Sequence, residues 1–150
     1  MKDKLDLITE KARTNKRLKF TSLIHHINEE NLVRCYQELK RNRASGIDNI
    51  TVEEYGKNLK ENISNLLRNL KTKSYKPQPV KRVYIPKPGK RDEKRGLGLP
   101  TVEDKLVQLM VKKILEAIYE TDFLDSSYGF RPNRNCIQAV YKLNQEVMKK

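Results

Sequence analysis

The sequence has no tryptophan and only two cysteines among its 150 residues. Cys35 and Cys136 form no CxxC pair, and no histidine cluster has ligand spacing, so neither a zinc knuckle nor a disulfide framework is indicated. The adjacent His25 and His26 would face different ways on a helix, which favours ordinary packing over metal binding. No apolar run approaches the length of a membrane span, and the N-terminus lacks a continuous apolar stretch, so we expect a cytoplasmic protein.

Acidic residues are scarce relative to basic ones. The chain has 19 Asp and Glu against 32 Lys and Arg, a formal net charge of +13, and the basic residues recur in every segment. Such an excess favours a polyanionic partner. Because no segment has an amphipathic face rich in aromatic residues, nucleic acid is favoured over a membrane surface.

A long basic stretch runs from Val80 to Pro100. Two short extended segments, Val80 to Pro86 and Lys94 to Leu99, flank a turn rich in Pro, Gly and charge, which predicts a β-hairpin. Gly96 and Gly98 would let a backbone or a ligand come close. We expect this hairpin to face phosphate groups through its cations, which are Lys81, Arg82, Lys87, Lys90, Arg91, Lys94 and Arg95.

Capping signals and helical periodicity predict helices on both sides of the hairpin. The expected helices cover residues 29–41 after an Asn28 cap, 52–71 after a Thr51 and Glu54 capping box, a segment after Thr101 and Asp104, and 135–150, with one or two short helices before residue 27. Leu106, Met110, Ile114 and Ile118 should pack against the sheet, and Val140, Leu143 and Val147 should form the inner face of the last helix. The predicted class is α+β, with helices packed around a small antiparallel hairpin.

Several short blocks occur in a fixed order along the chain. They are Phe20-Thr-Ser-Leu23, Gly46-Ile-Asp48, Ile85-Pro-Lys87, Leu97-Gly-Leu-Pro-Thr-Val-Glu-Asp-Lys-Leu-Val-Gln108 and Ser127-Tyr-Gly-Phe-Arg-Pro-Asn-Arg134. They are distributed over roughly three quarters of the chain, which makes them more specific than a lone motif. In sequence and order they resemble the fingers region of the reverse transcriptases encoded by group II introns.

This resemblance implies that residues 28–150 are the fingers subdomain of a right-hand polymerase. Residues 1–27 would be an N-terminal extension that helps to bind intron RNA. The family's nucleotide-binding Lys and Arg correspond to Lys87 and Arg95, which would reach the triphosphate of the incoming nucleotide. Phosphoryl transfer depends on positioning and charge neutralisation, and an Arg can hold phosphate oxygens bidentately.

The other basic residues are candidates for RNA binding. They are Lys81, Arg82, Lys90, Arg91, Lys94, Arg41, Arg43, Arg131 and Arg134. Arg131 resembles a family residue near the template strand, although a structural salt bridge is an equal alternative for it. Tyr128, Gly129 and Phe130 are expected to shape the loop rather than to touch substrate.

The polymerase carboxylates that hold a pair of metal ions are missing from this sequence. Asp122 and Asp125 flank Phe123-Leu124 in a predicted loop, and Asp48 is expected to be a turn or cap residue. We therefore expect no catalytic residue, no metal ligand and no cofactor in this chain, and no polymerisation by it alone. Mg²⁺ is expected for the full-length enzyme. The last helix lacks a Gly or Pro stop signal, which is consistent with a truncated palm.

The expected partners are intron RNA, template RNA and a primer-template duplex, and a homodimer is left open. A stand-alone RNA-binding module that assists splicing is the alternative function. A helical DNA-binding protein is disfavoured, because the helix from Val102 begins with acidic residues rather than base-reading ones. The sequence departs from the family pattern at Gly96, Asn133 and Asn135, where Pro, Gly and Ser are usual. Gly96 would loosen the strand after Arg95, which puts the orientation of the Arg95 guanidinium group in doubt.

Overall fold

The computed structural model describes residues 4–149, and only the backbone of Lys90 and Arg91. Within this range the chain forms six α-helices, one 3-10 helix and one two-stranded antiparallel sheet, so the α+β class is confirmed. The chain divides into two compact units. The larger one covers Phe20–Ile114, and the smaller one joins the N-terminal residues through Lys19 to the residues from Leu115 onward.

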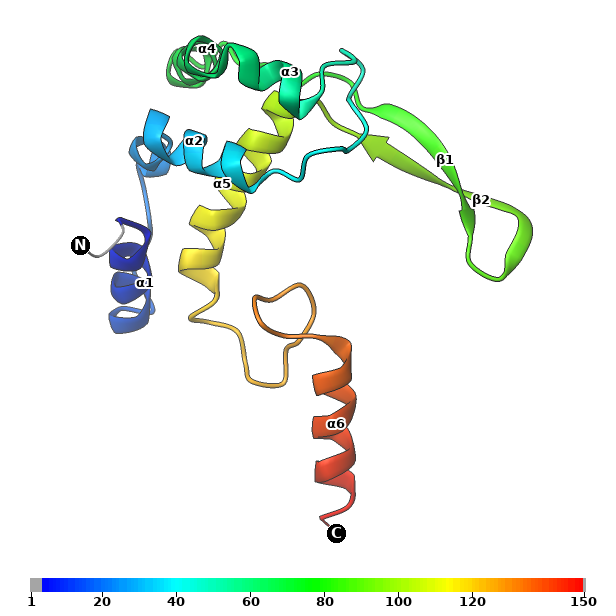
Figure 1. Ribbon diagram of the computed structural model, residues 1–150. Coiled ribbons are helices and arrows are strands. Elements are labelled where there is room, and N and C mark those ends of the chain that lie inside the picture. Colours follow the sequence, from blue (N-terminus) through cyan, green and yellow to red (C-terminus); the bar gives the residue numbers. More distant parts are fainter. Residues whose placement is uncertain (1–3, 150) are drawn as a thin grey trace. The chain divides into compact units, whose positions relative to one another are not determined.

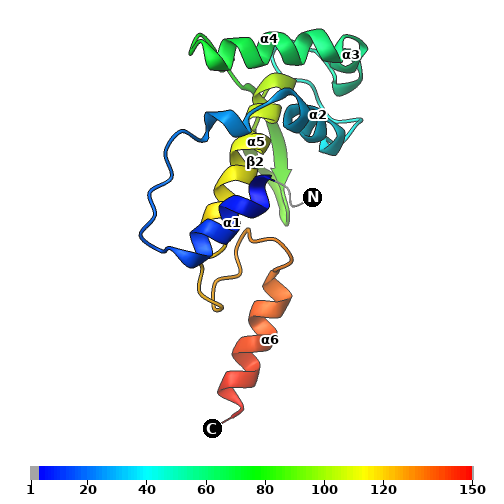
Figure 2. The same cartoon turned by 90° about the vertical axis from the view of Figure 1, so that its left-hand side faces the viewer.

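In the larger unit, four helices build the core. Figure 1 and Figure 2 both show α2 (Glu29–Glu38) crossing the first half of α5 (Val102–Tyr119), with α3 (Val52–Lys57) and α4 (Leu59–Lys71) near the start of α5. The fully buried side chains come from α2, α4 and α5. They are Leu32, Cys35, Ile63, Leu66, Val102, Leu106 and Met110. The predicted stripe of α5 is therefore buried, but against helices rather than against the sheet.

Helix α2 begins at the predicted residue but ends earlier than predicted. Asn28 caps the helix by accepting a hydrogen bond from the Asn31 amide at 2.9 Å. The helix ends at Glu38 because Leu39 already has extended backbone angles, so residues 40–46 form a loop. A short 3-10 helix, η1 (Leu23–His26), precedes α2.

The helix predicted over residues 52–71 is broken at Asn58 into α3 and α4. The Thr51 and Glu54 capping box is present, with hydrogen bonds of 2.8 and 3.2 Å. Gly56 lies where the Tyr36 hydroxyl approaches α3 and donates to the Val52 carbonyl at 2.9 Å. The break frees the Tyr55 carbonyl, which accepts a hydrogen bond from the Asn62 side chain at 2.9 Å.

The predicted hairpin consists of β1 (Lys81–Lys87) and β2 (Lys90–Leu99). Its turn uses Gly89, whose φ of 76° favours glycine. A register shift between Pro86 and Lys87 marks a bulge near this turn. Figure 1 shows the hairpin extending away from the helices, and most of its described side chains are exposed. The expectation that helices pack around the hairpin is therefore wrong, because the core of this unit is made by helices alone.

The smaller unit contains α1 (Lys4–Thr14) and α6 (Cys136–Val147). Ile8 and Ala12 of α1 are buried, and Lys16 pairs with Asp122 at 2.7 Å. The predicted inner face of α6 is exposed at Val140, Leu143 and Val147, so that prediction is wrong for the described residues. The periodic pattern correctly indicates an amphipathic helix, but no described element covers its apolar face. No helix in residues 4–149 is long and apolar enough to cross a membrane.

Gly46 is buried where the loop before α3 meets the strand exit of the hairpin. A Cβ atom at this position would lie 2.7 Å from the Thr101 Cα and 2.8 Å from the Thr101 nitrogen. Those neighbours are backbone atoms, which cannot rotate away as a side chain can. The glycine of the Gly46-Ile-Asp48 block is thus needed for close packing.

We expect Gly46→Ala to lower the free energy of unfolding by about 1–3 kcal/mol, because the added methyl group overpacks this contact. Chemical denaturation monitored by circular dichroism measures the loss. Gly129→Ala is the matched control, since a Cβ there meets nothing within 4 Å. Equal stability of the two variants would contradict the packing role.

Candidate nucleic-acid interface

The base of the hairpin is held by the carboxylate of Asp104, in the first turn of α5. The side chain is 4% exposed. It accepts hydrogen bonds from the Tyr75 hydroxyl, from the Gln78 amide at 3.2 Å and from the Thr101 hydroxyl at 2.9 Å. The Thr101 oxygen in turn accepts from the Asp104 amide at 3.3 Å, which confirms the predicted cap. The strand entry, the strand exit and the start of α5 therefore meet at one carboxylate.

Two tyrosines near the start of α5 stay protonated. Burial, reinforced by the Asp104 carboxylate, raises the pKa of Tyr75 above its usual range. Burial and the nearby Glu103 do the same to the pKa of Tyr55, whose hydroxyl donates to Glu103 at 3.4 Å. Protonated hydroxyls can donate to the carboxylates. They thereby hold the start of α5 to the segment that enters the hairpin and to α3.

The strand register divides the hairpin into two faces. Residues directly opposite each other in an antiparallel pair share a face, and neighbours along a strand alternate. The Lys87 face carries Lys81, Val83, Ile85, Lys87, Arg95, Leu97 and Leu99. The Tyr84 face carries Arg82, Tyr84, Pro86, Lys94, Gly96 and Gly98.

Lys87 and Arg95 lie on the same face, as the predicted nucleotide site requires. Ile85 stands directly opposite Arg95, so Lys87 is two residues further along the same side of β1. Lys87 pairs with Glu93 at 2.7 Å, and both side chains are 45% exposed. An exposed pair of this kind contributes little stability, so it leaves the ammonium group available to a phosphate.

The other cations of the hairpin and the loop before α3 are solvent-accessible. Lys81 donates to the Asn49 side chain at 2.9 Å, while Arg82 and Lys94 extend from the Tyr84 face. Arg41 and Arg43 are exposed in the loop that follows α2. The side chains of Lys90 and Arg91 lie outside the described part of the chain. RNA binding by all these residues stays a prediction.

Arg131 adopts the structural alternative that the sequence left open. It is 9% exposed, and its Nε and Nη2 atoms donate to Glu120 at 3.0 and 2.7 Å. Its Nη1 atom donates to the carbonyl oxygens of Leu124 and Ser127, both at 2.8 Å. These bonds hold the loop between α5 and α6. This geometry favours the salt bridge over a contact with a template strand.

Arg134 is also engaged within this loop. It donates to the Asp125 side chain at 3.0 Å and stacks over the Tyr128 ring at 5.2 Å. Tyr128 therefore shapes the loop as expected. Phe130, in contrast, is fully exposed with a φ of 57°, so its expected role in shaping the loop stays a prediction.

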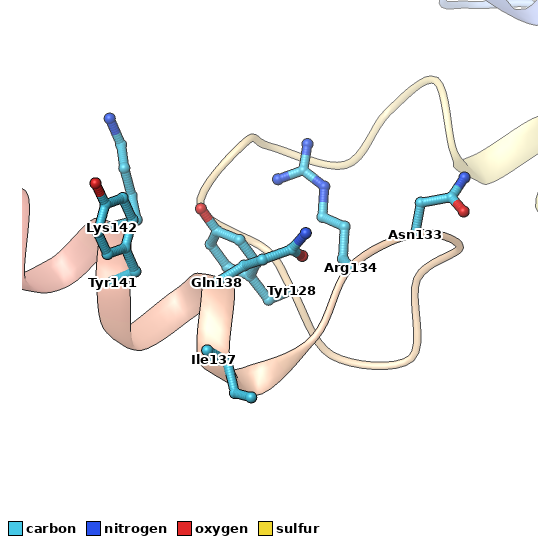
Figure 3. Close-up of a pocket in the computed structure, with 7 residues that line it drawn as sticks. All are labelled: Tyr128, Asn133, Arg134, Ile137, Gln138, Tyr141 and Lys142. Atoms are coloured by element: carbon cyan, nitrogen blue, oxygen red, sulfur yellow. The ribbon is translucent and has the colours of Figure 1, made fainter.

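A pocket of about 490 Å³ lies between this loop and the first turns of α6. Figure 3 shows the Tyr128 ring beside Gln138, and Tyr141 next to Lys142. Both of its cations are already paired, Arg134 with Asp125 and Lys142 with Glu146 at 2.8 Å. An anion would therefore meet less unopposed positive charge here than on the hairpin.

The acidic residues that the structure describes are scattered rather than clustered. Within residues 4–149, no three His, Cys, Asp or Glu side chains come together as a metal site would need. Asp122 and Asp125 are paired with Lys16 and Arg134, and the Asp48 side chain accepts from the Ile50 amide at 3.2 Å as a turn residue does. The described residues thus do not fit the metal pair of a polymerase.

Comparison with known proteins identifies the family. The chain is 36% identical over 143 residues to the group II intron-encoded protein LtrA of Lactococcus lactis, which covers 95% of this chain and 24% of LtrA. The chain belongs to the group II intron-encoded proteins. The resemblance to proteins encoded by group II introns is therefore confirmed, while the assignment to the fingers subdomain stays a prediction.

Other relatives are similar in sequence to this chain over shorter stretches. The protein YkfC of Escherichia coli is 36% identical over 95 residues, 63% of this chain and 24% of YkfC. A putative COX1/OXI3 intron 2 protein of Saccharomyces cerevisiae is 36% identical over 101 residues, 67% of this chain and 11% of the yeast protein. No model of a protein family matches the chain. The chain spans about a quarter of the length of LtrA and YkfC.

The three departures from the group II intron pattern have local explanations. Asn135 caps α6 in a reciprocal capping box with Gln138, with both hydrogen bonds at 2.9 Å, as a Ser could. Asn133 has a φ of 59°, which Asn tolerates better than most residues do. Gly96 stands opposite Tyr84, on the face away from Arg95.

Asp104→Asn should detach the base of the hairpin, because an amide offers one acceptor oxygen where three donors converge. We expect a loss of about 1–3 kcal/mol in the free energy of unfolding. Amide hydrogen exchange should accelerate between Tyr75 and Lys81. Asp92→Asn, an exposed change in β2, is the control. Unchanged exchange in the Asp104 variant would refute the anchoring role.

Glu103→Gln tests the electrostatics of the same helix start. Burial, together with Asp104 and Asp48, raises the pKa of Glu103, although the Tyr55 hydrogen bond opposes this. A raised folded-state pKa gives stability that is present below the unfolded-state pKa and lost as the pH rises through the folded-state pKa.

The variant should therefore be more stable than the wild type near about pH 7, and this advantage should shrink as the pH falls to about 4. Denaturant titrations over this pH range measure the difference. Glu61→Gln, in the exposed first turn of α4, serves as the control. A variant that is less stable at neutral pH would show that the Glu103 charge is favourable there.

Proposed function

We propose that this chain is the fingers part of a group II intron reverse transcriptase and maturase, which binds intron RNA and a primer-template duplex. The carrying observation is the hairpin register, which puts Lys87 and Arg95 on one face of a hairpin that extends from its helical base. Two cations on one exposed face suit the triphosphate of an incoming nucleotide. They would neutralise its charge and orient it for transfer.

The distribution of charge supports the RNA-binding part of the proposal. The net charge is +13, and exposed cations occupy both faces of the hairpin and the loop before α3. Cations that neutralise phosphates release counterions, so binding should weaken steeply with salt. Arg41, Arg43, Lys81, Arg82 and Lys94 are the proposed phosphate contacts.

Catalysis would require carboxylates beyond those of the described residues. The proposed role of this chain is therefore to position nucleic acid and nucleotide, and the polymerase activity is proposed only for the complete protein. Mg²⁺ would belong to the palm of that protein. No step of the reaction is assigned to a side chain of this chain beyond binding the triphosphate.

Direct binding measurements test the RNA-binding role. The chain is titrated with a structured group II intron RNA and with an RNA-DNA primer-template duplex, over a salt series and with bulk competitor RNA. Tight binding of one RNA that survives competitor and weakens steeply with salt is expected. Weak binding that does not distinguish the nucleic acids would contradict the proposal.

Replacing Lys87 and Arg95 by Ala in the complete protein should raise the nucleotide concentration needed for half-maximal DNA synthesis by roughly 10- to 100-fold, as expected for lost charge-assisted hydrogen bonds. Intron RNA binding should stay largely intact. Primer extension at varied nucleotide concentration and filter binding measure the two quantities. The control is Lys60→Ala with Arg68→Ala, which removes the same charge from exposed positions of α4. An equal loss of nucleotide use and of intron RNA binding would contradict the assigned roles.

A further inference from the structure

The Tyr84 face of the hairpin is not used by the proposed nucleotide site. It lies on the side of the sheet opposite Lys87 and Arg95. The Tyr84 side chain is 60% exposed, although tyrosine rings are usually at least partly covered in folded proteins. The ring therefore lies on the strand surface without a covering element and is accessible to a ligand.

Gly96 lies directly opposite Tyr84 in the neighbouring strand and has no side chain. A Cβ atom on Gly96 would lie 3.7 Å from the Tyr84 Cε1 atom and 3.5 Å from the Arg82 Nε atom. The ring and the guanidinium group therefore both lie against a backbone that has no side chain. Gly98 follows opposite Arg82, so this part of β2 adds no bulk to the face.

The charges on the Tyr84 face are mostly positive. Arg82 stands on one side of Tyr84, and Lys94 stands opposite Pro86 on the other side. Glu93 pairs with Lys87 and so belongs to the opposite face. Asp92 lies nearer the turn, in the part of β2 between Lys90 and Lys94 where the register shifts.

An exposed aromatic ring between cations fits a nucleobase with its flanking phosphates. Base stacking on an aromatic side chain is tolerant of sequence, and Arg adds both charge and a stacking plane. Bases in a regular duplex are already stacked and cannot present a face to the ring, so an unpaired strand is the fitting ligand.

We propose that the Tyr84 face binds unpaired RNA, with one base stacked on Tyr84 and neighbouring phosphates at Arg82 and Lys94. This proposal rests on the proposed RNA-binding function, and adds to it a separate site for single strands. The Lys87 face remains free for the nucleotide.

The test compares Tyr84→Ala with Tyr84→Phe in the full chain. The probes are a fluorescein-labelled oligouridine of about 12 nucleotides and an RNA duplex of the same length, followed by fluorescence anisotropy. Tyr84→Ala should weaken oligouridine binding by about 5- to 100-fold, the range expected for one lost base stack. Tyr84→Phe should bind about as the wild type does, and duplex binding should be unchanged in both.

Two further variants separate stacking from loss of structure. Gly96→Val should also weaken oligouridine binding, because its side chain fills the space beside Tyr84 and Arg82 while valine suits a strand. Val83→Ala is the control on the Lys87 face and should leave oligouridine binding unchanged. Circular dichroism verifies that each variant keeps the secondary structure of the wild type.

The outcomes distinguish this inference from the proposed function. If the wild type binds oligouridine and Tyr84→Ala binds it equally well, the stacking site is refuted while RNA binding stands. A Phe variant as weak as the Ala variant, or an equal loss of duplex binding, would also refute it. If the wild type binds neither oligouridine nor structured intron RNA, the proposed function fails together with the site.

Discussion

The hydrogen bonds to the Asp104 carboxylate are the contacts on which the arrangement of the candidate site depends. A β-hairpin of two strands is marginally stable by itself in water, and this hairpin is not covered by the helices of its unit. Its ends are instead tied to the helical core, because Tyr75, Gln78 and Thr101 all donate to one buried side chain. Gly46 packs its backbone against the same place. The helical core therefore determines the direction in which the hairpin extends.

This anchoring explains how a projecting element can still present side chains in a defined way. Strand alternation puts Lys87 and Arg95 on one side and Tyr84 with Arg82 on the other. A hairpin packed into a core would have lost one of these faces to burial. Because both faces stay exposed, one element can carry both the proposed nucleotide-binding surface and the proposed surface for an unpaired strand.

Much of the local structure could be predicted from short-range signals. The Asn28 cap, the Thr51 and Glu54 box and the hairpin turn depend on residues within a few positions of one another, and all are present. The break at Asn58 was missed, because the capping box and the helical spacing of the apolar residues continue through it. Tyr84 was not among the candidates drawn from the sequence, and its exposure opposite Gly96 is seen only in the structure.

The sequence by itself determined the family, the net positive charge and the order of the elements, since these follow from motifs and composition. Only the tertiary structure decided which apolar stripes are covered and which cations are available. The stripe of α5 is buried and that of α6 is exposed, although both have helical spacing. Arg131 is buried by Glu120 and two carbonyl groups, whereas Arg82 extends into solvent. Burial and pairing depend on groups distant in sequence, which periodicity and charge cannot locate.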